Sequence, residues 1–195
     1  TARRVGLAAA SHVQVDVEGD GLVLFNLRND DRDVALKFSG QVLAEGGSVE
    51  MRAQARAGAV GQVLNMDGLV QARSLRQQGG RILIDGGTAG DTLVGGQLDA
   101  NGETGGQVTV LGQRVGLLDA ARVNASGRAG GGQVRIGGGV QGQGTTHNAE
   151  DTVVAAGAEI HADATAQGTG GLVAGALVTL VIHRLFPNWG RITRL

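Results

Sequence analysis

The residues Gly96-Gln97-Leu98-Asp99-Ala100, followed by a turn and then by Gly105-Gly106-Gln107-Val108-Thr109-Val110, set out a pattern that recurs along the chain. The pattern returns as Ala121-Arg122-Val123-Asn124-Ala125, a turn, and Gly131-Gly132-Gln133-Val134-Arg135-Ile136. In each half, apolar residues alternate with polar ones, which is typical of a β-strand with one buried face. The glycine pair stands where the chain must bend and a side chain would obstruct it. The pattern therefore predicts two short strands and a bend, repeated.

The first half of the pattern is a small residue, any residue, an aliphatic residue, any residue and alanine. Its copies begin at residues 40, 68, 96, 121 and 158, so the spacing is 28, 28, 25 and then 37 residues. A helical repeat keeps its length to keep its packing, whereas a solenoid of β-strands accepts longer loops at its corners. Between the copies lies a third short apolar segment, which is expected to form a third strand (Val63-Leu64, Leu93-Val94, Leu117-Leu118 and Val153-Val154).

These features together predict an all-β fold, a right-handed parallel β-helix with three short strands per coil. The hand follows the general preference of parallel crossover connections. Stacked coils should align equal positions of the repeat, so that side chains form columns. The expected inward columns are Val42, Val70, Leu98, Val123 and Ile160; Ala44, Ala72, Ala100, Ala125 and Ala162; Val49, Ile82, Val108, Val134 and Val173; and Met51, Ile84, Val110 and Ile136.

Composition excludes several classes of protein. The chain has 36 glycines but one proline among 195 residues and no strict triplet, which excludes collagen. Aromatic residues make up 2%, which excludes a core of large rings, and hydrophobic residues make up 42%, which argues against disorder. The net charge of −1 with interspersed signs predicts no binding to nucleic acid. Because the chain has no cysteine, it has no disulfide and no thiol nucleophile.

The longest insertion, residues 137–151, carries side chains that suggest a metal or acid–base site. It contains His147, Glu150 and Asp151, but no second histidine stands at ligand spacing. A structural loop is therefore the favoured interpretation. The charged run at residues 29–33 lacks the spaced oxygen ligands and closing glutamate of a calcium loop, so it is interpreted as a solvated loop. The polar corner at residues 73–78 is interpreted as solvated rather than anion-binding.

A carbohydrate-cleaving enzyme on this fold would need acidic groups gathered on one face. The relevant outward column contains a single carboxylate, and Asp85 and Asp119 are expected on other sides of the coil (the column is Leu43, Gln71, Asp99, Asn124 and His161). The sequence therefore predicts no catalytic, cofactor-binding or metal-binding residues and no enzyme activity. A lyase or glycosidase stays an alternative. So does passive binding of glycans, although the few aromatic residues weigh against stacking on sugars.

Residues 131–171 resemble a known family. The carrying motifs are Gly131-Gly132-Gln133-Val134-Arg135-Ile136, Gln141-Gly142-Gln143-Gly144, Gly157-Ala158-Glu159-Ile160-His161-Ala162 and Gly168-Thr169-Gly170-Gly171. They look like the filamentous haemagglutinin family of large exoproteins, which are bacterial adhesins of the two-partner secretion type. The similarity extends from Val13 to Gly171 and concerns the β-helical shaft rather than the N-terminal secretion module.

This resemblance implies a secreted or cell-surface protein associated with the outer membrane. The implied function is that of a structural and adhesive shaft module without catalysis. The implied partners are an outer-membrane transporter during export and a host-cell or surface receptor or glycan that the sequence does not identify. The family supplies no catalytic residues and no cofactor.

Residues 1–171 are expected to form the shaft fragment. Within them, residues 13–17 and 22–25 are two runs of alternating residue character, separated by a turn signal. Residues 172–195 are expected to form a divergent C-terminal segment. Its first part, residues 172–182, is apolar on both faces and too short for a membrane-spanning helix. Three interpretations stay open: a cap over the end of the solenoid, a coil completed by further residues, or a frame-disrupted gene end.

Overall fold

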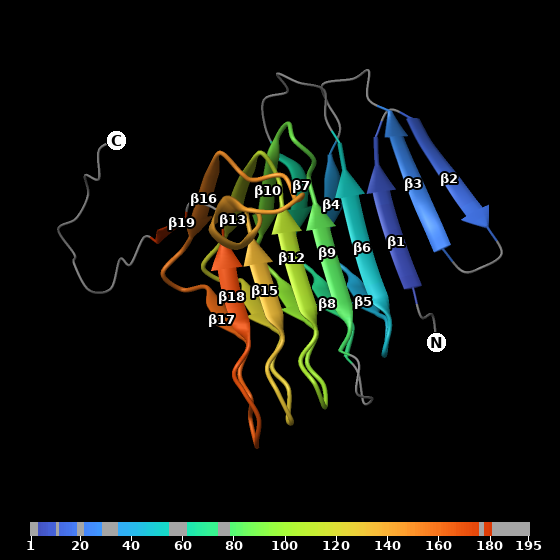
Figure 1. Cartoon of the computed structure of the whole chain (residues 1–195). Coiled ribbons are helices and arrows are strands. Elements are labelled where there is room, and N and C mark those ends of the chain that lie inside the picture. The colour runs from blue at the N-terminus through green and yellow to red at the C-terminus, as the bar shows by residue number, and fades with distance from the viewer. Residues whose placement is uncertain are drawn as a thin grey trace.

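The computed structural model describes residues 4–10, 12–18, 22–28, 35–54, 62–73, 79–175 and 178–180. Over these residues the chain winds into stacked coils, and each complete coil contributes one strand to each of three parallel sheets. In Figure 1 the strands of the front sheet point upward, the chain returns behind them, and successive coils follow from right to left. The winding is therefore right-handed. The predicted right-handed parallel β-helix with three short strands per coil is confirmed.

The chain visits the three sheets in turn. Sheet I contains β1 (Arg4–Ala9), β6 (Ser48–Ala53), β9 (Arg81–Asp85), β12 (Gln107–Leu111), β15 (Gln133–Ile136) and β18 (Leu172–Gly175). Sheet II contains β4 (Leu36–Phe38), β7 (Gln62–Met66), β10 (Asp91–Val94), β13 (Arg114–Leu117), β16 (Asp151–Val154) and β19 (Val178–Leu180). Sheet III contains β5 (Gln41–Leu43), β8 (Leu69–Gln71), β11 (Gln97–Asp99), β14 (Arg122–Asn124) and β17 (Glu159–His161). The third apolar segment of each repeat therefore contributes a strand, as expected, and that strand belongs to sheet II.

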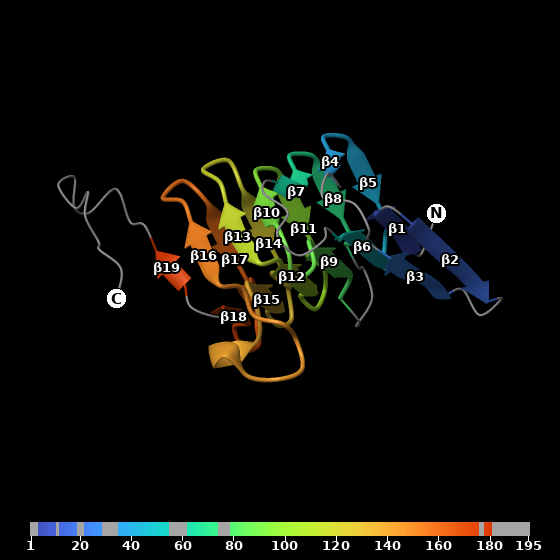
Figure 2. The same ribbon diagram turned by 90° about the horizontal axis from the view of Figure 1, so that it is seen from above.

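Two elements depart from the repeat. The strands β2 (His12–Glu18) and β3 (Leu22–Arg28) form an antiparallel hairpin in which Val15 lies opposite Phe25. This hairpin separates β1 from β4 and lies beside β1 at the N-terminal end of the stack (Figures 1 and 2). The second element is a short 3₁₀ turn, η1 (Val140–Gly142), within the long insertion. The alternating runs near the N-terminus are thus strands, but they pair with each other rather than with coils.

The predicted columns supply the sheet I and sheet III sides of the core, except that Val173, on the last described strand of sheet I, is half exposed and Val42 and Ile160 are partly buried. Sheet II adds buried side chains that were in no predicted column (Leu64, Met66, Val94, Val115, Leu117 and Val154). Leu98 pairs in register with Val70 on one side and with Val123 on the other, and all three side chains have no exposed surface. Burial of one such aliphatic side chain contributes about 1.5–3 kcal/mol. The alanine column lies at the corner after sheet III, where the amide of Ala100 donates a 2.8 Å hydrogen bond to the carbonyl oxygen of Asn124. All five alanines of this column are buried.

The glycine pair is required by close approach of backbones. A Cβ atom on Gly106 would collide with the carbonyl oxygens of Gly80, in the preceding coil, and of Ala100. Gly132 and Gly171 have the same relationship to the coils before them. The predicted steric role of these glycines is confirmed, because the second glycine of each pair stacks directly on its equivalent.

At the C-terminal end, β18 pairs with β15 and β19 pairs with β16, both in parallel, so the stacking continues beyond Gly171. Leu172 and Val173 expose 40% and 50% of their surface on this last strand of sheet I. The division at residue 171 and the three interpretations of the C-terminal segment stay predictions, since residues 176–177 and 181–195 lie outside the described residues. The runs at residues 29–33 and 74–78 lie outside them as well. Within the described ranges, no helix is long and apolar enough to cross a lipid bilayer.

Candidate functional site

The loops that connect sheet III to sheet I project from the described solenoid. We call residues 100–106, 125–132 and 162–171 the corner ridge, and these loops project side by side at the bottom of Figure 1. Their backbones pair from coil to coil. Isolated parallel bridges join Gly102 to Gly127 and Gly127 to Ala164, and the amide of Gly105 donates a 2.9 Å hydrogen bond to the carbonyl oxygen of Gly130. The backbone pairing of neighbouring coils therefore continues from the sheets into the ridge loops.

The last residues of β11 and β14 accept hydrogen bonds from the loops that follow these strands. The Oδ1 atom of Asp99 accepts a 3.1 Å hydrogen bond from the amide of Asn101. One coil later, the Oδ1 atom of Asn124 accepts a 2.9 Å hydrogen bond from the amide of Ser126. A side-chain oxygen that bonds the backbone two residues on is the defining contact of an Asx turn. The two loops therefore leave the sheet in the same direction.

Two ion pairs connect neighbouring coils at this corner. Arg128 donates to both carboxylate oxygens of Glu103, over 2.9 and 3.3 Å. The hydrogen bond from Arg128 is the main cause that lowers the pKa of Glu103 below its ordinary value. Arg73 donates a 2.7 Å hydrogen bond from Nε to Asp99, which is 8% exposed. Arg73, considered from sequence as a solvated or anion-binding residue, thus binds a carboxylate of the next coil.

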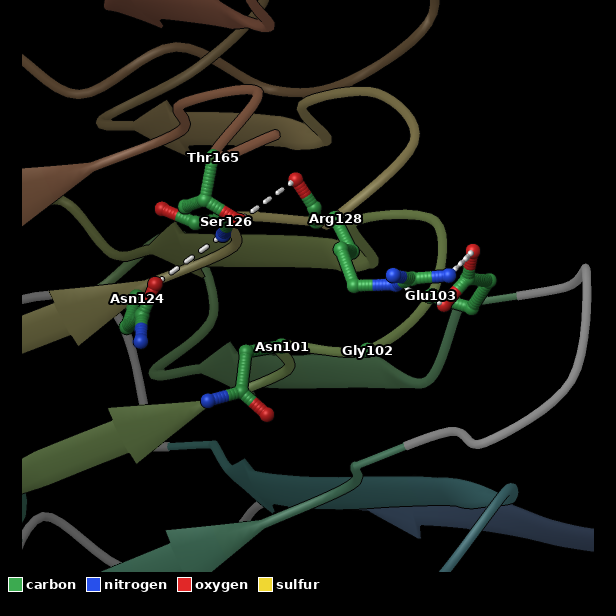
Figure 3. A pocket seen from close by; sticks show the side chains of 8 residues that line it. Asn101, Gly102, Glu103, Asn124, Ser126, Arg128 and Thr165 are labelled. Carbon is green, nitrogen blue, oxygen red and sulfur yellow. Dashed lines mark hydrogen bonds and ion pairs between the residues drawn. The ribbon is translucent and has the colours of Figure 1, made fainter. Parts of the chain in front are cut away.

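Three loops of the ridge enclose an open hollow of about 420 Å³. The residues that line it are polar residues and glycines from three successive coils (Asn101, Gly102, Glu103, Asn124, Ser126, Gly127, Arg128 and Thr165; Figure 3). The ionisable groups among these lining residues are Glu103 and Arg128, and they bind each other. A glycosidase requires two carboxyl groups that flank the scissile bond. The hollow therefore offers hydrogen-bonding groups rather than acid–base chemistry.

The candidate residues of the long insertion have different partners. Nε2 of His147 lies 3.7 Å from Oδ1 of Asp85, whereas Glu150 accepts a 3.1 Å hydrogen bond from the side-chain amide of Gln113. Asp151 begins β16 and pairs in register with Arg114. Among the described residues, no group of three or more histidine, aspartate or glutamate side chains is placed to hold a metal ion.

The insertion is closed by Asn148. Its Oδ1 atom accepts a 3.1 Å hydrogen bond from the amide of Gly139, and its Nδ2 atom donates a 2.7 Å bond to the carbonyl oxygen of Gly142. The amide of Glu150 donates to the carbonyl oxygen of Gln113 in the preceding coil. These contacts fold the insertion back onto the solenoid.

The carboxylates weighed for catalysis lie apart and bind backbone amides. Asp85 accepts a 2.9 Å hydrogen bond from the amide of Gly87, and Asp119 accepts a 3.1 Å bond from the amide of Gly157. Asp85 ends a strand of sheet I, whereas Asp119 follows a strand of sheet II. With Asp99 at the end of sheet III, the three carboxylates belong to three different corners of the coil.

Sequence analysis missed part of the hollow. The opposite charges of Glu103 and Arg128, three residues after the corner alanine in each repeat, were a signal for their ion pair. Thr165, which sequence analysis did not single out, stands at the same offset after Ala162, and its amide donates a 2.9 Å hydrogen bond to the carbonyl oxygen of Gly127.

The fold places this chain in the class of parallel β-solenoids with three strands per coil. No protein-family model matches the chain, and no curated protein matches it. The resemblance to the filamentous haemagglutinin family therefore stays a prediction that rests on the motifs within residues 131–171.

Proposed function

We propose that this chain is part of a secreted, surface-displayed shaft of a filamentous haemagglutinin-like exoprotein, with a structural and adhesive role and no catalysis. In this proposal an outer-membrane transporter exports the protein, and the corner ridge is the face that meets a receptor or glycan on another surface. The proposal also assigns the protein to the outside of a bacterial cell.

The observation that supports the proposal most directly is the continuous column Val70, Leu98 and Val123, buried completely and in register. A solenoid whose coils contact their nearest neighbours gains stability with each coil added. Such a structure is stiff, extends by repetition, and is suited to fold coil by coil on emergence from a transporter. The ridge loops add a row of polar side chains outside the stack, where another molecule can reach them.

A graft experiment tests export and display. The chain replaces an equal length of shaft in a two-partner exoprotein, downstream of its secretion module, in cells with or without the matching transporter. We expect the grafted protein outside the cell and accessible to added protease when the transporter is present. Retention in the periplasm despite a functional transporter would contradict the shaft role.

Two neighbouring residues of β11 provide matched controls. Leu98→Asp places a charge in the buried column and is expected to reduce export, whereas Gln97→Asp changes an exposed position and is expected to leave it unchanged. Adhesion is measured on the same cells, as attachment to host cells relative to cells that display the secretion module alone. Equal attachment would remove the adhesive part of the proposal and leave the structural part.

A further inference from the structure

The hollow of the corner ridge carries side-chain groups that the fold leaves unused. Among the described residues, the side-chain amide of Asn101 makes no hydrogen bond, although its backbone amide does. Asn124 uses Oδ1 to accept from Ser126, which leaves its Nδ2 donor unoccupied. Ser126 accepts a 3.0 Å hydrogen bond from the amide of Asp163, so its hydroxyl proton stays available to donate. Figure 3 shows that Asn101 and Asn124 belong to adjacent coils along the hollow.

The charges of the hollow compensate each other. The carboxylate of Glu103 holds the guanidinium of Arg128 through two hydrogen bonds, and this contact lowers the pKa of Glu103, so the pair stays ionised at neutral pH. An anion would have to displace Glu103, and a cation would have to displace Arg128. The unused groups are neutral amides and hydroxyls, and they favour a neutral ligand rich in donors and acceptors.

The backbone of the ridge is already occupied. Backbone amides of the ridge donate to backbone carbonyl oxygens of the next or preceding coil. The pairs are Gly102 to Ser126 over 3.2 Å, Gly127 to Asp163 over 2.9 Å, and Thr165 to Gly127 over 2.9 Å. A peptide that adds as a strand needs a row of free backbone groups. This face therefore does not suit an extended peptide, and recognition must come from side chains.

The spacing of these side chains matches a repeating ligand. Two of the unused groups, the side chains of Asn101 and Ser126, directly follow the corner alanines of adjacent coils. They are therefore separated by the distance between stacked strands, about 4.8 Å. The sugar rings of an extended, β-linked polysaccharide follow one another at a similar interval, and each ring carries hydroxyls that donate and accept. We propose that the corner ridge binds a neutral, linear polysaccharide that runs along the stacking direction, with one sugar facing each coil. The proposal rests on the proposed function, since it names what the ridge meets.

No aromatic residue lines the hollow. Each sugar is therefore held by hydrogen bonds without ring stacking, and the contribution of one sugar is small. Affinity should then grow with the number of sugars in contact, up to the three coils that line the hollow.

The test uses the folded chain and the series glucose, cellobiose, cellotriose and cellotetraose, measured by calorimetry or by NMR shifts. We expect affinity to rise from one sugar to three and then to level off. Maltotetraose, whose α-linkages curve the chain, should bind more weakly than cellotetraose. Absence of binding throughout the series, or affinity that does not depend on length or linkage, would overturn the proposal.

Three variants locate the site. Asn124→Asp keeps the Oδ1 acceptor for Ser126 and removes the Nδ2 donor, and Asn101→Ala removes an unused amide. Each should weaken cellotriose binding about fivefold to tenfold. Gln97→Ala removes an exposed amide of β11 outside the hollow and should leave binding unchanged. Thermal unfolding confirms that all three variants fold, and equal losses in all three would contradict the assignment to the ridge.

The graft experiment and the sugar titration test the shaft role and the polysaccharide site separately. A chain that is exported and displayed but binds none of the oligosaccharides rejects the polysaccharide site and leaves the shaft role intact. A chain that binds cellotriose but is retained inside the cell rejects the shaft role and leaves the site intact.

Discussion

Oγ1 of Thr92 donates a 2.8 Å hydrogen bond to the carbonyl oxygen of Leu111, which ends the sheet I strand of the next coil. Thr152 occupies the equivalent position two coils after Thr92 and is equally buried, but its Oγ1 atom has no hydrogen-bond partner. The same residue type in the same column thus has a bonded hydroxyl in one coil and an unbonded one in another.

This difference predicts that the same substitution changes the free energy of unfolding differently at the two positions. Thr92→Val removes a buried hydrogen bond and should lower the free energy of unfolding by about 1 kcal/mol. Thr152→Val removes an unbonded buried hydroxyl and should be neutral or stabilising. Urea unfolding of the two variants beside the parent chain measures both. Equal losses of stability would contradict the hydrogen-bond assignment.

Gly106→Ala should be among the most harmful small substitutions, because the new Cβ atom meets carbonyl oxygens that belong to packed backbone. Overpacking of this kind costs about 3 kcal/mol. Gly170→Ala is the matched control, since its Cβ atom would have nothing within 4 Å. Thermal unfolding should separate the two variants clearly, and similar transition temperatures would argue against the stacked glycine column.

The Glu103–Arg128 pair predicts a local pH dependence. Because the pKa of Glu103 is lowered in the folded chain, the pair contributes above the ordinary pKa of glutamate, and the contribution is lost as the pH falls through the lowered value. NMR titration of the Glu103 carboxyl should show this lowered midpoint, and Arg128→Gln should move it back toward the ordinary value. Both side chains are exposed, so overall stability should change little. An unchanged midpoint in Arg128→Gln would show that another group causes the shift.

Gln141 adopts a left-handed backbone conformation, with φ 54° and ψ 29°. Glycine adopts this conformation without the Cβ strain that costs other residues about 1–2 kcal/mol. Gln141→Gly should therefore stabilise the chain by up to about 1 kcal/mol after the entropy cost of glycine. Gln143→Gly, at an extended position, should destabilise it instead. Hydrogen exchange at the insertion amides reports both effects, and destabilisation by Gln141→Gly would refute this reasoning.

Much of the fold could be predicted because a parallel stack aligns equal positions of the repeat. Once Val70, Leu98 and Val123 occupy the same place in successive copies, stacking follows from the register alone. The antiparallel pairing of β2 with β3 was not predicted. Alternation marks a buried face but does not say which strand pairs with which.

The candidate site was predicted only in part. The corner loops with Asn101 and Ser126 were aligned from sequence, because their residues hold equal offsets from the alanine column. The link from Arg73 to Asp99 joins residues 26 positions apart and depends on the path of a loop. The contact of His147 with Asp85 likewise depends on how the insertion folds back across the coils.

The repeating sequence pattern was sufficient to specify the three strands per coil, the aliphatic columns, and the alanine and glycine corners. Each of these features follows from the size and polarity of residues at a fixed position in the repeat. Folding in three dimensions was needed to join Arg73 to Asp99, to place His147 beside Asp85, and to leave Thr152 without the hydrogen bond that Thr92 makes. These contacts depend on the backbone path of individual loops and on side-chain conformation, and neither follows from the repeat.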